Sequence, residues 1–218
     1  MSLQGLANLL KGRTKELRHA TVFVCGLAGA GKTTLCHGLI ELLPSGSTIL
    51  RQDWFTRFIT QERLARIASA RDSGDTIALE REENPFNWHD LGAFFECAER
   101  LVRTGGLVLR GAFDQRTGRK DATFSVKLGG SSSLLLCDGI YLLHPLARMY
   151  SDQVVFIDIP FETSVERVRG RDGHRASDEY LRFKAGLRRK HDLPYATKWR
   201  KDTDIVMRGT SPRVDQAE

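Results

Sequence analysis

The chain has 218 residues, of which 41% are hydrophobic and 28% charged, a composition that suits one globular core and excludes a disordered or fibrous chain. No apolar run approaches the roughly 18 residues of a membrane span, and residues 1–18 lack the apolar segment of a secretory signal. We therefore expect a cytoplasmic protein that does not bind membranes. The net charge of +6 comes without the basic–aromatic repeat of RNA-binding proteins, so we expect no nucleic-acid partner but a cleft that attracts anionic nucleotides.

Short apolar runs alternate with helical patterns along the chain. A leading helix is expected within residues 1–20, and a polar stretch at 56–84 shows weak helical periodicity before a loop. Strands are expected at residues 21–25, 48–50, 107–109, 123–126, 133–137, 154–157 and 204–207. Helices are expected at residues 33–43, 90–104, 178–191 and from 163, where Thr163 and Glu166 fit a capping box. The polar tail at 211–218 is expected to be disordered.

The cysteines do not have the spacing of a metal site. They are Cys25, Cys36, Cys97 and Cys137. Cys25 and Cys137 fall inside predicted strands, so we expect reduced, buried thiols.

The segment Gly26-Leu-Ala-Gly-Ala-Gly-Lys32-Thr33 matches the phosphate-binding pattern G-x-x-x-x-G-K-[ST], with a β-forming run before it and a helical pattern after it. Its glycines let successive backbone N–H groups turn toward phosphate oxygens, and the following helix directs its positive dipole end at the same anion. Lys32 is expected on the β- and γ-phosphates, and the hydroxyl of Thr33 on Mg²⁺. The residues expected to bind the nucleotide are Gly26, Ala28, Gly29, Ala30, Gly31, Lys32, Thr33 and Thr34.

This loop identifies a nucleoside triphosphate but not a reaction, because hydrolytic switches, motors and kinases share it. The alternation of strands and helices predicts an α/β fold of the P-loop NTPase class, a doubly wound and mainly parallel β-sheet flanked by helices. In such a sheet, ligands bind beyond the C-terminal ends of the strands.

Carboxylates follow several of the predicted strands. Asp53 is the candidate catalytic base for an attacking alcohol, and the alternative is an N-cap of a helix from Trp54. Asp138 is the candidate Mg²⁺ ligand, and the alternative is a turn-forming Asp-Gly pair. Asp158 precedes Ile159-Pro160 and is expected to shape a loop.

Arginines cluster behind the predicted strand at 154–157. Arg167 and Arg171 are four residues apart and share a helix face, where their guanidinium groups could clamp the transferring phosphoryl group. A solvated basic face is the alternative.

Taken together, several segments resemble the uridine kinase and phosphoribulokinase family of P-loop kinases over about residues 21–209. The similar segments are Gln52–Phe55, Asn87–Phe94, Phe113–Arg119, Cys137–Ile140, Arg167–Asp172 and Ala196–Gly209. The resemblance implies a kinase domain at 21–210 with a small helical lid at about 166–178. It also implies ATP and Mg²⁺ as cofactors, a small-molecule hydroxyl as acceptor, and Asp53 as the base.

The sequence departs from that family where the acceptor is recognised. Phe113 and Gly118 occupy positions that contact the nucleobase in uridine kinases, and His89 aligns with the aspartate that holds the ribose. A site that loses polar partners loses selectivity for its ligand, so another nucleoside, a sugar or a vitamin-like alcohol are further candidates. The residues expected to contact the acceptor are Asp53, Phe55, His89, Phe113, Arg116 and Arg119.

Two other functions stay open from the sequence. A regulatory P-loop NTPase or nucleotide-binding protein without kinase activity would be compatible with the altered acceptor residues. A nucleoside monophosphate kinase would be compatible with the abundance of arginine. No Asn-Lys-x-Asp run typical of GTP switches occurs, but the sequence does not decide between ATP and GTP, or whether the chain forms a homo-oligomer.

Overall fold

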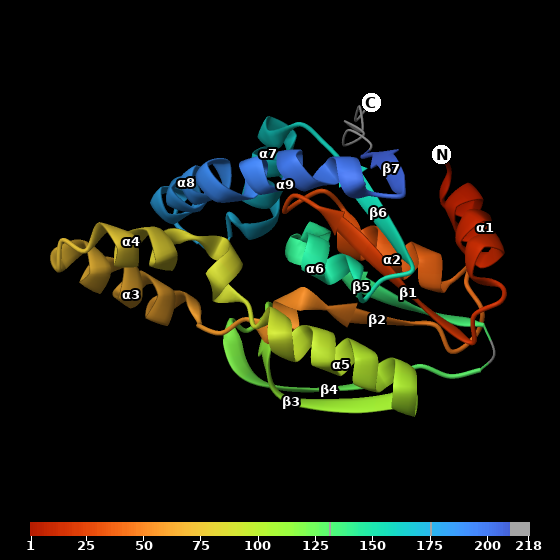
Figure 1. Cartoon of the computed structure of the whole chain (residues 1–218). Coiled ribbons are helices and arrows are strands. Elements are labelled where there is room, and N and C mark those ends of the chain that lie inside the picture. Colours follow the sequence, from red (N-terminus) through yellow and green to blue (C-terminus); the bar gives the residue numbers. More distant parts are fainter. Residues whose placement is uncertain (131, 175, 210–218) are drawn as a thin grey trace.

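The computed structural model describes residues 1–130, 132–174 and 176–209. They form a five-stranded parallel sheet in the order β2-β5-β1-β6-β7 (Figure 1). Its strands are β1 (His19–Gly26), β2 (Thr48–Arg51), β5 (Ser133–Asp138), β6 (Gln153–Asp158) and β7 (Ile205–Arg208). The predicted doubly wound parallel sheet is confirmed. The tail predicted at 211–218 lies outside the described residues.

Both faces of the sheet are buried, which explains why its strands are apolar without alternation. From β1, Phe23 and Cys25 enter one hydrophobic core and Val22 and Val24 enter the other. Helix α5 (Leu91–Thr104) contributes to the first core, and α1 (Leu3–Thr14) and α2 (Lys32–Ile40) to the second (Figure 1). The leading helix therefore ends six residues before the limit of the expected range 1–20, and it packs on the same sheet.

A β-hairpin stands apart from the parallel sheet. It consists of β3 (Gly106–Asp114) and β4 (Arg119–Lys127), which pair antiparallel. The sequence predicted two shorter strands with a polar segment between them, but that polar segment extends both strands and closes in a turn where the amide of Gly118 donates to the carbonyl of Asp114. The hairpin reaches the sheet through Trp54, whose ring stacks on Phe124 at 4.3 Å.

The polar stretch at 56–84 forms a helical hairpin, α3 (Thr60–Asp72) and α4 (Thr76–Glu83), which projects from one end of the molecule (Figure 1). The loop predicted for its second half was wrong. Asp75 caps α4 by accepting from the amides of Ile77 and Ala78, and a bidentate ion pair between Arg66 and Glu82 joins the two helices.

The C-terminal helices also differ in detail from the prediction. Helix α7 (Phe161–Asp172) begins after Pro160 without a side-chain cap, so the predicted capping box is not formed. The helix expected at 178–191 is α8 (Asp178–Leu187), which continues through the π-helical turn η4 (Arg188–Asp192) into α9 (Leu193–Trp199). The remaining elements are α6 (Pro145–Arg148) and the 3-10 turns η1 (Gln52–Phe55), η2 (Pro85–Trp88), η3 (Tyr141–Leu143) and η5 (Arg200–Asp202). Among the described residues, no helix is long and apolar enough to cross a membrane.

Candidate active site

The glycine-rich loop connects the central strand β1 to α2. Strand β1 lies between β5 on one side and β6 on the other. Gly31 is the N-cap of α2 with φ of 96°, a left-handed conformation that favours glycine. At Gly29 a Cβ atom would lie 2.9 Å from the carbonyl oxygen of Ser164 on α7. The loop is therefore built tightly against α7, with the N-terminus of α2 open toward an anion.

Lys32 folds back over this loop. Its Nζ donates to the carbonyl oxygens of Gly26 at 3.0 Å and Leu27 at 3.1 Å. Thr34, one turn into α2, is exposed. Among the residues that the structure describes, the carbonyls of Gly26 and Leu27 are the hydrogen-bond partners of the ammonium group, which can turn to phosphate oxygens without breaking an ion pair.

Asp138 lies beside the loop because β5 pairs with β1 in the register that places it opposite Val24. Its carboxylate accepts a 2.5 Å hydrogen bond from the Thr33 hydroxyl. Burial raises the pKa of Asp138, and the nearby charge of Lys32 opposes that shift. A hydroxyl and a carboxylate in contact offer the oxygen ligands that Mg²⁺ prefers, so the pair fits the predicted metal site.

Asp53 lies in η1, just beyond the C-terminal end of β2, with its side chain 45% exposed. The guanidinium of Arg51 lies between Asp53 and Asp138, with Nη2 3.7 Å from the Asp53 carboxylate and Nε 3.8 Å from the Asp138 carboxylate. The alternative role as a helix N-cap is not realised, because η1 begins at Gln52 without a side-chain cap. The carboxylate is thus available to a ligand.

His89 borders the same space. Burial lowers its pKa to about 4, although the charge of Asp53 acts in the opposite direction, so the imidazole is neutral at physiological pH. Its Nδ1 is buried without a hydrogen-bond partner among the described residues. A backbone bridge between Thr56 and His89 fixes the segment in this position. The ring also hydrogen-bonds the backbone of Gln52, so Nδ1 of this neutral imidazole is the atom suited to hydrogen-bond a polar ligand.

The predicted arginines come from α7, which packs on the phosphate-binding loop. Ser164 donates to the carbonyl of Ala28 at 2.6 Å, and Arg167 donates to that of Gly29 at 3.3 Å. Arg171 forms an ion pair with Asp172, and its charge also interacts with Asp53. Both arginines therefore lie on the side of the helix that faces the loop and the cleft.

The structure separates the residues predicted to contact the acceptor. Phe113 and Arg116 line a cavity of about 550 Å³ together with Asp53 and Arg51. Phe55 instead belongs to the core, where its ring meets Phe94 edge-on at 5.4 Å. Arg119 is exposed near the turn of the hairpin and does not line that cavity.

Several charged residues at the cleft were not found from the sequence. The charge of Arg63, on α3, interacts with that of Asp53, and Lys184 on α8 interacts with Arg63 and Arg171. Asp192 in η4 accepts a 2.5 Å hydrogen bond from the Tyr141 hydroxyl, and its charge interacts with Lys32. They belong to segments far from the loop in sequence, so no local pattern could have marked them.

Asp158, which was expected to shape a loop, is not part of this group of contacts. Asp158 forms an ion pair with Arg200 at 3.2 Å. Asp90 caps α5 by accepting from the amide of Ala93. The four cysteines are free thiols, of which Cys25, Cys36 and Cys137 are buried as expected, whereas Cys97 is only half-buried.

The sequence matches no protein-family model and no curated protein. Its structure is similar to a proposed fructose transport system kinase from Silicibacter sp. TM1040, with a TM-score of 0.64 and 17% identity over 95% of this chain and 99% of the other. For a proposed uridine kinase from Bacillus stearothermophilus, the TM-score is 0.62 and the identity 18%, over 95% and 100%. For phosphoribulokinase from Rhodobacter spheroides they are 0.61 and 12%, over 88% and 70%. The chain therefore has the P-loop NTPase fold, which is the fold that the sequence predicted.

Proposed function

We propose that this protein is an ATP- and Mg²⁺-dependent kinase that transfers a phosphoryl group to a hydroxyl of a small molecule, as in the uridine kinase and phosphoribulokinase family. The observation that carries the proposal is the position of Asp53. Asp53 does not cap a helix, and it lies just beyond β2, the neighbour of β5 in the sheet. Arg51 links it to the Asp138–Thr33 pair. A carboxylate in this position can take a proton from an acceptor hydroxyl or from water, so the dependence of turnover on the acceptor is what separates the kinase from a hydrolytic NTPase.

Each group has a role that follows from its place. Gly26–Thr34 would bind the triphosphate, with Lys32 on its terminal phosphates, and Thr33 and Asp138 would hold Mg²⁺, which neutralises phosphate charge. Asp53 would orient the acceptor hydroxyl and receive its proton. Arg167 and Arg171 would neutralise charge on the transferring group from the lid at about 166–178. We retain His89, Phe113 and Arg116 as candidate acceptor contacts, and assign Phe55 to the core.

A nucleotide-binding protein without kinase activity and a nucleoside monophosphate kinase are the competing functions. The first requires that ATP turnover ignore every acceptor. The second requires that the phosphoryl group pass to a phosphate oxygen rather than to a hydroxyl. Phosphorus NMR of the product distinguishes an ester from an anhydride and so separates the second from our proposal.

The test is ADP formation with a panel of hydroxyl-bearing acceptors. We expect acceptor-dependent turnover that falls by about 100-fold or more in Asp53→Asn, and in Lys32→Ala with the fold retained. Asp121→Asn is the matched control, because Asp121 is exposed on β4, away from the site. Turnover that is indifferent to both the acceptor and Asp53 would refute the kinase.

A further inference from the structure

Cationic side chains gather on one side of Asp53, between α3 and α8. Arg63 projects from α3, Lys184 from α8, and Arg188 from the first residue of η4. Their charges interact with one another: Lys184 with Arg63, Arg171 and Arg188. None of them lines the cavity that contains Phe113, so they define a different side of the cleft.

These cations have few partners within the protein. Across the described residues, Lys184 and Arg188 make no side-chain hydrogen bond or ion pair, although both are half-buried. Arg63 donates to the Thr60 hydroxyl and lies 4.8 Å from the ring of Trp88, but its Nε is buried without a partner. Asp172 is already bound bidentately by Arg171. The buried carboxylate of Asp192 also interacts with the charges of Lys184 and Arg188. Together with Arg63 and Arg171, these cations still outnumber Asp172 and Asp192. An excess of partly buried positive charge is costly, so a ligand that supplies negative charge would stabilise this arrangement.

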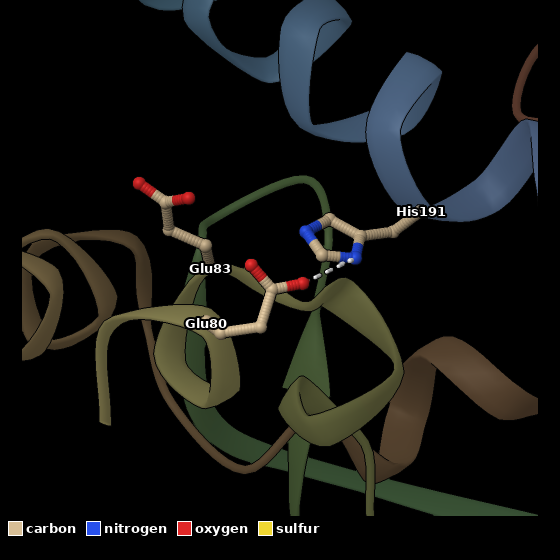
Figure 2. Close-up of side chains that lie close together, drawn as sticks. All are labelled: Glu80, Glu83 and His191. Atoms are coloured by element: carbon tan, nitrogen blue, oxygen red, sulfur yellow. Dashed lines mark ion pairs between the residues drawn. The ribbon is translucent and has the colours of Figure 1, made fainter. Parts of the chain in front are cut away.

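Contacts between α4 and η4 hold the two sides of this cationic cluster together. Figure 2 shows Glu80 of α4 directed at His191 of η4, with the dashed line between them, and Glu83 of α4 beside Glu80. The ammonium of Lys190 lies between the same two carboxylates and binds both, so that an ammonium already fills this acidic group. The contacts fix the α3–α4 hairpin against the chain that follows α8, which keeps Arg63 opposite Lys184.

The triphosphate has its own cations. Lys32 lies on the glycine-rich loop and Arg167 contacts that loop directly. Arg63 and Lys184 come instead from α3 and α8, and Arg63 is within electrostatic range of Asp53, the proposed base. Because they lie near Asp53, where the acceptor hydroxyl is proposed to bind, the acceptor is the ligand expected to supply the negative charge.

We propose that the acceptor carries an anionic group, a carboxylate or a phosphate monoester, which Arg63 and Lys184 bind while its hydroxyl lies at Asp53. This inference rests on the proposed kinase function and narrows its substrate class. A guanidinium and an ammonium that approach from two helices would select a hydroxylated acid or a sugar phosphate over its neutral counterpart.

The test is calorimetric binding to the protein loaded with Mg·ADP, with acceptors that differ only in charge. Glycerol is compared with glycerate and glycerol phosphate, and ribose with ribose 5-phosphate, which separates carboxylate from phosphate. We expect the anionic member to bind about tenfold tighter or more. In Lys184→Met that preference should fall by about tenfold while the affinity for Mg·ADP stays unchanged.

Lys184→Arg keeps the charge and should retain the preference. Lys201→Met removes an exposed lysine in η5 and is the matched control. The inference would be overturned if the neutral members bound as tightly as the anions or more tightly, or if none of the anions bound. It would also be overturned if Lys184→Met lost affinity for Mg·ADP alone. Anion binding that depends on Lys184, without ADP formation from any acceptor of the panel, would keep the anion site but refute the kinase and with it the assignment of that anion to an acceptor. Turnover of neutral acceptors alone would do the reverse.

Discussion

Replacing Lys184 with methionine should make the nucleotide-free protein more stable. Burial, with Arg188 as the next cause, lowers the pKa of Lys184 from 10.5 to about 8. Each pKa unit corresponds to about 1.4 kcal/mol between protonation states, so holding this lysine charged at pH 7 costs about 3 kcal/mol of unfolding free energy. Methionine fills a similar volume without the charge and removes that cost.

The pH dependence gives the prediction its sign. The folded chain holds the proton less tightly than the unfolded chain, so the cost is fully present below about pH 8 and disappears as the pH rises to 10.5. Urea unfolding should therefore show Lys184→Met more stable by up to about 3 kcal/mol at pH 7, with a difference that shrinks toward pH 10.5. Lys201→Met, on the surface, should stay within about 0.5 kcal/mol of the wild type. A Lys184→Met protein no more stable at pH 7, or a gain independent of pH, would refute the reasoning.

Three further changes test other parts of the site. Asp138→Asn should raise the Mg²⁺ concentration needed for half-maximal turnover by about tenfold or more, measured by Mg²⁺ titration, because a charged oxygen ligand is lost. Tyr141→Phe removes the hydroxyl that donates a hydrogen bond to the buried carboxylate of Asp192, and burial raises the pKa of that carboxylate to about 6. The unfolding free energy should fall by about 1–3 kcal/mol at pH 7. It should fall by less at pH 5, where the carboxyl group is protonated. Gly29→Ala places a Cβ 2.9 Å from a backbone oxygen at φ of 77°. It should lower the unfolding free energy by about 1–3 kcal/mol and weaken nucleotide binding in a fluorescence titration. Gly170→Ala is the control, because its Cβ meets no atom within 4 Å, and it should have neither effect.

Local patterns were enough for the nucleotide side of the site. The glycines and lysine of the loop are contiguous, and the strand and helix that position them lie directly on either side, so one segment of about 20 residues determines the geometry. Asp138 was also within reach of the sequence, since parallel strands end at one edge of the sheet and the apolar run at 134–137 directly precedes it. Thr33 was predicted at the same magnesium site, whereas its direct 2.5 Å hydrogen bond with Asp138 follows from the pairing of β5 with β1.

What the sequence by itself determined is therefore the fold class, the phosphate-binding loop and the carboxylates at strand ends. Only the tertiary structure decided the acceptor side, where Arg63 and Lys184 stand on helices more than a hundred residues apart. The polar α3 carried only weak periodicity, because its face is covered by ion pairs and a tryptophan rather than by a hydrophobic stripe. Phe55 shows the converse: it lies two residues after Asp53, the proposed base, but turns into the core, since neighbours in a 3-10 turn point in different directions.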